Sequence, residues 1–280
     1  MSRAQRANVA QQTLAICESR RYTSPSGRLC DMIEALGEAL DATQLYRPSD
    51  KRWTWARCAE RLTARASCAP ARLEVRNETT LSAARRLLAE GAEGGVLALN
   101  FASAKNPGGG FLGGSQAQEE SLARASALYP CLLTQPDYYS ANRACGTALY
   151  TDHMIYAPRV PVFRDDHDQL TEDLDLISFI TAPAPNAGAL RDEERRRLRA
   201  TFEARTDQLL AWACALGYTR LVLGAWGCGV FRNDPATVAE IFALRLGPGG
   251  SFAQAFEVVA FGVLDSHGGA TLRAFEEALG

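Results

Sequence analysis

The sequence lacks most features that would mark a membrane, secreted or metal-binding protein. Its 280 residues contain no apolar run of membrane-spanning length, and the first twelve, MSRAQRANVAQQ, are too polar for a signal peptide. The eight cysteines form no CxxC pair, and no Cys/His cluster has zinc spacing. We therefore expect no metal and no cofactor, reduced thiols and a cytoplasmic location.

The chain also has little net charge. The 30 Lys and Arg and the 32 Asp and Glu give a formal net charge of −2. No overall electrostatic field therefore attracts the chain to nucleic acid or to an anionic membrane. Residues 1–70 are mildly basic, with 11 Lys and Arg against 7 Asp and Glu, and a solvated helical face explains this better than a polyanionic partner. We expect no membrane partner, no direct DNA binding and a monomer.

What the sequence does contain is the alternation of strands and helices that is typical of an α/β domain. Residues 3–20 and 28–45 have helical spacing, and we interpret residues 1–70 as a helical extension packed on a domain formed by residues 71–280. Prolines 158 and 161 predict breaks in the strand region that precedes residue 166. The elements expected in residues 71–280 are strands near 72–77, 94–100, 148–166, 173–182, 218–224 and 256–265, and helices near 78–94, from about 118 onward, 190–216, 233–246 and 269–279.

One glycine-rich stretch, residues 106–120 or NPGGGFLGGSQAQEE, follows the predicted strand 94–100. Glycines let a backbone approach a ligand closely, because no Cβ stands in the way. Gly108, Gly110 and Gly113 match the GxGxxG pattern of dinucleotide-binding proteins. That pattern needs the glycines directly between a strand and its helix, whereas here the first glycine comes eight residues after the strand. An NAD-binding oxidoreductase is therefore a weak alternative.

A second glycine loop, residues 224–231, follows the predicted strand near 218–224 and leads to a helix that begins near Asn233 and Asp234. Free backbone N–H groups and the positive end of a helix dipole favour an anion such as a phosphate at such a place. The alternative is a turn that needs glycine for its own geometry. If the two preceding strands are parallel neighbours, both glycine loops lie at the same edge of the sheet.

The first glycine loop ends in two adjacent carboxylates, Glu119 and Glu120. On a helix, adjacent side chains point ~100° apart, so these two cannot flank one glycosidic bond from opposite sides. One of them could act as a general acid while the other binds a hydroxyl group. A general acid at neutral pH needs a raised pKa, and a helix N-terminus works against this. The alternative is a solvated pair that complements the helix dipole.

These two loops together resemble those of the poly(ADP-ribose) glycohydrolases. The resemblance rests on the glycine triplet 108–110, a spacer of seven residues, the sequence Gln118-Glu119-Glu120, and the second loop GAWGCGVFRND. It is closest to the short bacterial type and covers residues 70–280 well and the extension loosely. The resemblance implies an α/β fold, a macrodomain-like three-layer α/β/α arrangement with a mixed sheet, plus the N-terminal helical extension.

The resemblance also implies roles for single residues. Glu120 would be the general acid that protonates the departing 2′-oxygen of a ribose–ribose bond, through an oxocarbenium-like transition state, and Glu119 would bind a ribose hydroxyl. With no second carboxylate opposite, the diphosphate of the substrate would orient or deprotonate the attacking water, and Phe231 would position it. The remaining residues expected to bind the ligand are Asn106, Gly108, Gly109, Gly110, Gln118, Gly227, Cys228, Gly229 and Val230.

The adenine pocket and the range of partners are less defined. Glu78 and Phe261 are candidates for the adenine site, with Asp265 as a third, although each has a structural explanation as well. The expected partners are poly(ADP-ribose) and ADP-ribose, and ADP-ribosylated proteins remain an open further case. We expect hydrolysis mainly from the chain end, because no segment stands out that could clasp an onward-running polymer. A macrodomain that binds ADP-ribose without cleaving it is the main alternative.

Overall fold

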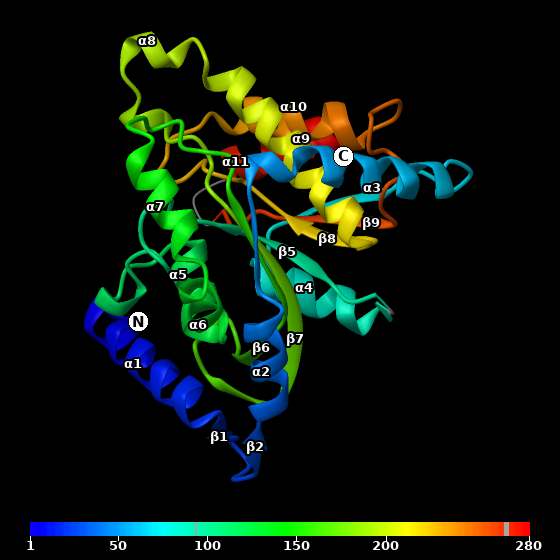
Figure 1. The fold of residues 1–280 in the computed structure, drawn as a ribbon. Helices are drawn as coiled ribbons and strands as arrows, with labels where there is room; N and C mark the ends of the chain where they lie inside the picture. The colour runs from blue at the N-terminus through cyan, green and yellow to red at the C-terminus, as the bar shows by residue number, and fades with distance from the viewer. Residues whose placement is uncertain (93, 266–268) are drawn as a thin grey trace.

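The protein is built on one seven-stranded mixed sheet with helices on both faces, as Figure 1 shows. The computed structural model describes residues 1–92, 94–265 and 269–280. Strand order is β3-β6-β7-β5-β8-β9-β4; the last five strands run parallel, and β3 and β6 pair antiparallel. The strands are β3 (Gln44–Tyr46), β4 (Arg72–Arg76), β5 (Leu97–Phe101), β6 (Met154–Arg164), β7 (Leu170–Ala182), β8 (Arg220–Leu223) and β9 (Val258–Gly262).

The helices form a layer on each face of the sheet, which confirms the predicted α/β/α arrangement. Alternate side chains of a strand point to opposite faces: Leu97 and Leu99 join one core cluster, and Ala98 joins the other. The first layer contains α3 (Lys51–Ala64), α9 (Leu198–Leu216), α10 (Pro235–Leu246) and α11 (Ala270–Leu279). The second contains α2 (Ile33–Asp41), α4 (Thr80–Ala89), α5 (Gln118–Ala125), α6 (Leu128–Leu133) and α7 (Pro136–Ala144).

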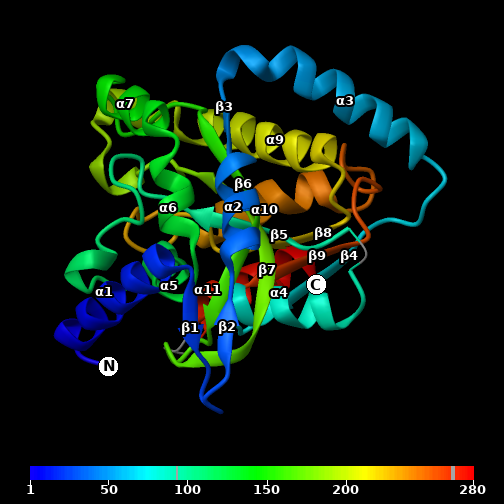
Figure 2. The ribbon, with the colours of Figure 1, turned by 60° about the horizontal axis from the view of Figure 1, so that its bottom comes forward.

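Residues 1–70 are less helical than expected. The helix α1 (Arg3–Ser19) is confirmed, but the predicted helix over 28–45 is wrong at both ends, which form β2 (Leu29–Asp31) and β3. The strand β2 pairs with β1 (Arg21–Thr23), and β3 adds an edge strand to the main sheet beside β6. Tertiary pairing has overridden local helical spacing here. Figure 2 shows this blue segment running along the sheet from β2 to β3.

Two other sequence expectations need correction. Prolines 158 and 161 do not break the strand: β6 runs from Met154 to Arg164 and accommodates them through register shifts after Ala157 and after Val162. The predicted helix over 190–216 is interrupted, with a single turn, α8 (Asp192–Arg195), before α9 begins at Leu198.

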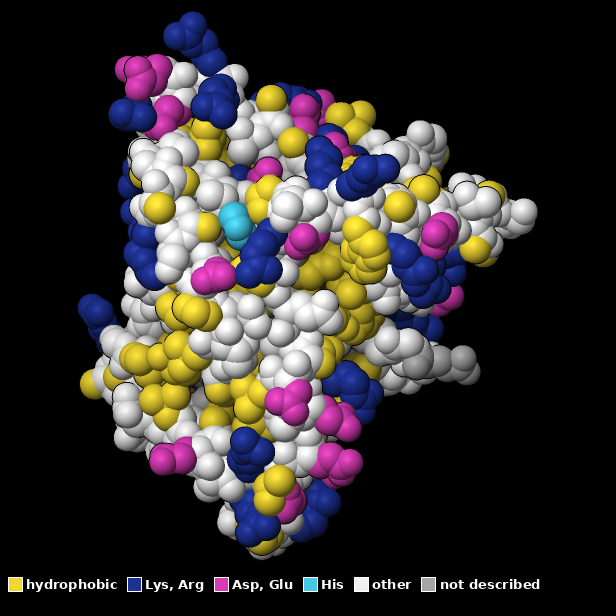
Figure 3. Space-filling model, in the orientation of Figure 1, with side chains coloured by type: hydrophobic (Ala, Val, Ile, Leu, Met, Phe, Trp, Pro, Cys, Tyr) yellow, Lys and Arg dark blue, Asp and Glu magenta, His cyan; other side chains and the backbone are white. Residues whose placement is uncertain are grey.

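The sheet topology brings the two glycine loops together. The strands β5 and β8 pair in parallel, Leu97 opposite Leu221, so the chain leaves both strands at the same edge of the sheet. On the face drawn in Figure 3, basic and acidic side chains are interspersed, and hydrophobic side chains gather between them. Within the described residues, none of the helices combines the length and the apolar character needed to cross a membrane.

Candidate active site

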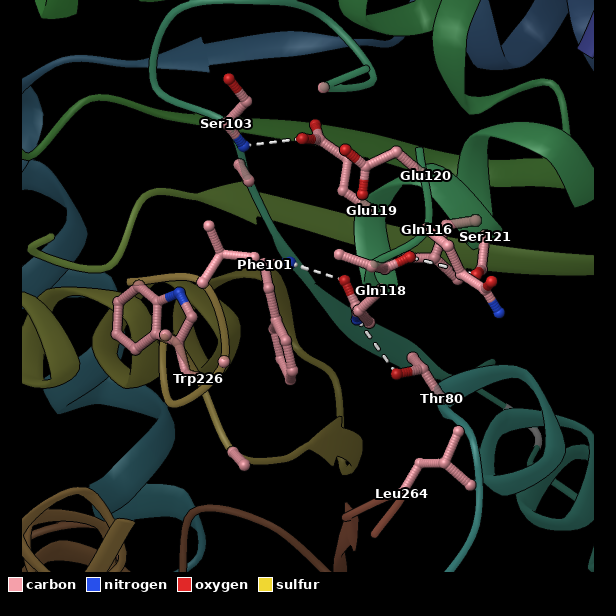
Figure 4. Close-up of a pocket in the computed structure, with 18 of the residues that line it drawn as sticks. Thr80, Phe101, Ser103, Gln116, Gln118, Glu119, Glu120, Ser121, Trp226 and Leu264 are labelled. Carbon is pink, nitrogen blue, oxygen red and sulfur yellow. Dashed lines mark hydrogen bonds between the residues drawn. The ribbon is translucent and has the colours of Figure 1, made fainter. Parts of the chain in front are cut away.

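A cavity of about 930 Å³ opens beyond the carboxyl ends of β5 and β8. This is where an open α/β sheet binds its ligands. Its lining comes from the two glycine loops, the start of α4, the turn between β6 and β7, and the segment after β9. Figure 4 shows Glu119 and Glu120 at one end of this cavity, Trp226 on the opposite wall and Leu264 at the other end.

The first glycine loop folds back on itself between β5 and α5. Gly108 and Gly109 have φ angles of +65° and +59°, which L side chains rarely adopt. A Cβ on Gly109 would lie 2.4 Å from Oε1 of Glu120 and 3.2 Å from Oε2 of Glu119. Glycine is therefore required here because both carboxylates converge on the backbone of this loop.

Glu119 is buried, with 2% of its surface exposed. Its Oε2 accepts a hydrogen bond from the Ser103 N–H at 2.6 Å, and its Oε1 accepts one from Nδ2 of Asn100 at 3.3 Å. Burial raises the pKa of Glu119 to about 8, although the hydrogen bonds from Ser103, Asn100 and the Gly108 backbone favour the charged form. Gly108 itself does not line the cavity and supports Glu119 instead.

Glu120 lies beside Glu119 and is less buried. Its Oε1 accepts a hydrogen bond from the Gly110 N–H at 3.0 Å. Its Oε2 has no hydrogen-bond partner within the described residues, so this oxygen is available to a ligand. The residue before the pair, Gln118, also lines the cavity, but its amide is engaged with the Phe101 N–H, the Leu99 carbonyl and Thr80 Oγ1, and it fixes the start of α5 against β5.

The second glycine loop leaves β8 and is held by Asn233. The side chain of Asn233 donates to the carbonyl groups of Pro185 and Gly227, at 2.8 and 3.0 Å. The backbone N–H groups of Gly229, Val230 and Phe231 donate no hydrogen bond within the described part of the chain. Backbone donors gathered in one loop at a cavity are suited to an anion such as a diphosphate.

The sequence predicts that the N-terminus of α10 contributes to this anion site, but in the structure it does not. Asp234 caps the helix: its Oδ2 accepts from the Thr237 N–H at 2.9 Å and from Thr237 Oγ1 at 2.6 Å. Its carboxylate already supplies the negative charge that the helix dipole favours. Cys228, within the loop, is not suited to act as a nucleophile, because burial raises the pKa of its thiol to about 12.

Phe231 lines the cavity together with Tyr150, a residue that sequence reasoning missed. Their ring centroids are 6.0 Å apart. Tyr150 has a φ of +58°, an unfavourable angle for an aromatic residue, and the buried guanidinium of Arg205 donates to its carbonyl and to those of Leu149 and Pro183. No local sequence pattern could reveal this contact, because Arg205 lies on α9, far along the chain.

The three residues expected at the adenine site, Glu78, Phe261 and Asp265, lie in different surroundings. Glu78 lines the cavity, and its carboxylate is paired with Arg86 at 2.7 Å. Phe261 is wrong as a site residue: it is fully buried and packs against Phe242 and Phe275 in the core. Asp265 accepts hydrogen bonds from the first backbone N–H groups of α11, including that of Thr271, so it has a helix-capping role.

The remaining residues expected at the site line the cavity: Asn106, Gly109, Gly110, Gly227, Gly229 and Val230. Three aspartates that sequence reasoning missed also line it, Asp165, Asp166 and Asp168 from the turn between β6 and β7. Asp166 accepts a hydrogen bond from Thr79, and Asp168 pairs with Arg124. Among the described residues, no group of three His, Cys, Asp or Glu side chains could hold a metal ion.

Comparison with known proteins places this geometry in a family. A model described as the catalytic domain of microbial-type PARG matches residues 10–165. The chain belongs to the microbial-type PARG family. Poly(ADP-ribose) glycohydrolase (PARG) from Thermomonospora curvata is 45% identical, with a TM-score of 0.90 over 98% of this chain and 99% of that chain.

Other members of the family have been solved with ligands. The T. curvata PARG bound to the inhibitor ADP-HPD is 44% identical, with a TM-score of 0.89 over 98% of this chain and 99% of that chain. PARG from Deinococcus radiodurans in complex with ADP-ribose is 45% identical, with a TM-score of 0.81 over 88% of this chain and 97% of that chain. No match was found among curated proteins. The likeness confirms the macrodomain-like fold, and the NAD-binding oxidoreductase interpretation is wrong.

Proposed function

We propose that the protein is a poly(ADP-ribose) glycohydrolase that hydrolyses ribose–ribose O-glycosidic bonds and releases ADP-ribose. The family and the ligands of its solved members support this substrate. The observation that carries the chemistry is the carboxylate pair at one end of the cavity, in which Glu120 keeps one oxygen without a partner in the described chain while both oxygens of Glu119 are engaged. Glycosidases use such a carboxyl group as their general acid.

In this mechanism Glu120 gives its proton to the departing 2′-oxygen as the glycosidic bond breaks. Water adds to the anomeric carbon through an oxocarbenium-like transition state and gives up a proton to the diphosphate, which yields free ADP-ribose and a shortened polymer. That proton then replaces the one that Glu120 gave to the leaving oxygen. Glu119, whose pKa is raised to about 8, is largely protonated at neutral pH and can donate to a ribose hydroxyl. The diphosphate is bound by backbone N–H groups of residues 229–231, where it can orient the water that Phe231 contacts.

The two ends of the cavity then accommodate the two ends of the nucleotide. The ribose that carries the bond lies by Glu120, Asn106 and Phe231, and the adenine lies towards Glu78 and Leu264. Leu264 is an exposed apolar side chain of the lining, with 70% of its surface exposed, and it offers an apolar surface to a purine ring. Cleavage mainly from the chain end predicts monomeric ADP-ribose as the first product from long polymer, and early release of oligomers would contradict it.

Glu120→Gln tests the acid. We expect this variant to release ADP-ribose from automodified polymer about 10²- to 10⁴-fold more slowly than the parent, because the amide cannot supply the proton. Its affinity for ADP-ribose, measured by calorimetry, should stay within a few-fold. A matched control is Glu193→Gln, which alters a side chain on α8 that is 68% exposed.

Each outcome separates the candidate functions. Equal rates for the parent and Glu120→Gln would exclude Glu120 as the acid, and Glu119→Gln would then be the variant to compare. A parent protein that binds ADP-ribose but releases none from polymer would leave the non-catalytic ADP-ribose-binding module as the function.

We also propose a domain organisation, an oligomeric state and a cellular location for this protein. We propose that residues 71–280 form the catalytic unit, since every lining residue of the cavity falls within 78–271, and that residues 1–70 support it. We also propose that the protein is a monomer. All eight cysteines are free, which suits the cytoplasm.

A further inference from the structure

The helix α1 packs with one face against the first glycine loop and against α5, the helix that carries the candidate acid. Residues 3, 6, 10, 13 and 17 recur at three- and four-residue spacing and lie on this face. Ala10 is fully buried in a small apolar cluster with Phe111 and Ala123, which come from the glycine loop and α5. Both ribbon views place the dark blue helix beside α5 (Figures 1 and 2).

Polar contacts fix the start of this helix to one turn of the loop. Nε of Arg3 donates to the Gly113 carbonyl at 2.8 Å, and Nε of Arg6 donates to the Gly114 carbonyl at 2.9 Å. Gly114 has a φ of +72°, and a Cβ there would lie 2.0 Å from the Arg3 carbonyl oxygen. The helix therefore lies directly on the backbone of the loop, with no side chain between them.

These two arginines are in an unfavourable place for the helix itself. Both belong to the first two turns of α1, where the dipole favours acidic side chains, and the first turn contains none. Neither arginine forms an ion pair with a carboxylate among the described residues. Their guanidinium groups donate to backbone carbonyls of the loop and, for Arg6, also of Met1. Their hydrogen bonds to the loop offset the unfavourable interaction of two cations with the positive end of the helix dipole. Residues that break a local rule in this way are often functional.

A short chain of hydrogen bonds leads from this turn to Glu120. The Gly113 N–H donates to the Gly110 carbonyl at 3.0 Å, and so does the Ser115 N–H at 3.2 Å. Gly110 in turn donates its own N–H to Oε1 of Glu120. The position of Gly110, whose carbonyl faces this turn and whose N–H faces Glu120, thus depends on the turn that Arg3 and Arg6 hold, and so does the orientation of the Glu120 carboxylate.

We propose that Arg3 and Arg6 are positioning residues, and that α1 holds residues 108–115 in the geometry in which Glu120 meets the glycosidic bond. The catalytic part of this inference rests on the proposed function, whereas the mechanical part does not. Misplacing a reacting group by about 1 Å can cost about 10²-fold in rate. Loss of both arginine contacts should therefore lower kcat while the cavity remains able to bind its ligand.

The test compares the full-length parent with the double variant Arg3→Met/Arg6→Met. Methionine keeps a long side chain of good helix propensity and removes two cations from the positive end of the helix, so α1 itself is not weakened. We expect kcat on polymer to fall about tenfold or more, with KM within about threefold, because the lost interaction acts mainly in the transition state. Arg3→Lys/Arg6→Lys, which keeps a donor at each position, should recover part of the rate.

A second readout does not depend on activity. Amide hydrogen exchange of peptides covering residues 108–115 should be faster in the double methionine variant than in the parent, while peptides covering the second loop, residues 224–231, should not change. The matched control is Arg21→Met, which removes an exposed arginine of the same N-terminal segment, one that pairs with Asp31 instead of the loop. It should alter neither exchange in the loop nor kcat.

The outcomes are separable. Unchanged exchange in residues 108–115 would overturn the proposal, and so would a lower melting temperature with unchanged kcat, which would make α1 a purely stabilising element. If the parent releases no ADP-ribose, the proposed function fails together with the catalytic part of this inference, and the exchange comparison still decides whether α1 holds the loop.

Discussion

Glu119 and Glu120 are neighbours in the sequence, but their carboxylates lie in different surroundings. Glu119 is enclosed by β5 and the glycine loop, and Glu120 reaches the cavity with one oxygen unpaired in the described chain. Pairs of carboxyl groups with different environments are a common way for glycosidases to divide two roles. The raised pKa of Glu119 would also suit an acid, but only 2% of its surface is exposed, whereas Glu120 presents an unpaired oxygen to the cavity; for this reason we assign the role of acid to Glu120.

The buried carboxyl of Glu119 predicts a pH dependence of stability. Its pKa of about 8 in the folded chain exceeds the ordinary value of 4.5, so its contribution is complete below about pH 4.5 and is lost as the pH rises towards 8. Glutamine mimics the protonated form and does not titrate. We expect the free energy of unfolding of Glu119→Gln, relative to the parent, to increase by about 3 kcal/mol between pH 5 and pH 8.

Urea unfolding of both proteins at the two pH values measures this difference, and Glu193→Gln on the surface serves as the control. Parallel pH profiles for the parent and Glu119→Gln would show that Glu119 is charged in the folded protein at neutral pH. In that case Glu119 could not donate to a ribose hydroxyl.

At the scale of elements, the two glycine loops need their glycines for different reasons. The first uses its glycines because Glu119, Glu120 and α1 come too close for side chains. The second presents backbone N–H groups, and its glycines are not equivalent. Gly227 has a φ of +75°, and a Cβ there would lie 2.5 Å from side-chain atoms of Asn233 and Ala184, whereas Gly229 has no neighbour within 4 Å and no positive φ.

Gly229→Val is therefore a clean probe of the diphosphate site. We expect its free energy of unfolding to change by less than about 0.5 kcal/mol, because the added side chain meets nothing in the folded protein. Its affinity for ADP-ribose should fall at least about tenfold, since the side chain would occupy the space of the diphosphate or screen the N–H groups of the loop. Calorimetry with ADP-ribose and thermal unfolding measure the two effects.

Gly227→Val provides the contrast. It should destabilise the loop as well as weaken binding, because the residue it changes has a positive φ and close neighbours. Undiminished affinity in Gly229→Val would remove the second loop from the diphosphate site.

At the scale of the whole molecule, residues 1–70 and 71–280 share one core. Tyr46 of β3 is buried and packs on Trp212 of α9, with ring centroids 5.0 Å apart, and Cys58 of α3 is buried in the same cluster. The family model also spans residues on both sides of position 70. The catalytic unit proposed for residues 71–280 therefore contains the cavity but lacks part of its support.

This predicts that a fragment of residues 71–280 will not fold as a stable unit. Removing residues 1–70 exposes the apolar surface under α2 and α3, leaves β6 as an open edge strand and removes the contacts of α1 with the glycine loop. Far-UV circular dichroism, thermal unfolding and limited proteolysis of the fragment and the full chain check this. A fragment with a cooperative transition near that of the full chain would contradict it.

Much of this protein is determined by its sequence alone. Alternating strand and helix patterns predict an α/β domain, because these signals are local and depend on backbone geometry. The three-layer arrangement and the roles of the site residues follow from the family resemblance that the glycine triplet, Gln118-Glu119-Glu120 and the second loop carry. The same locality explains the errors. Residues 28–45 have helical spacing, but β3 forms at one end because β6 offers it an edge to pair with.

The tertiary structure decided which residues from distant segments of the chain contact one another. Phe261 was placed in the core by α10 and α11, Asp166 was brought to the cavity by the turn between β6 and β7, and Tyr150 was fixed by Arg205. It also decided how the two adjacent glutamates differ. Their order in the chain is the same in any fold, but burial and hydrogen bonding depend on which strands and loops surround each carboxylate, and only the packed protein determines these.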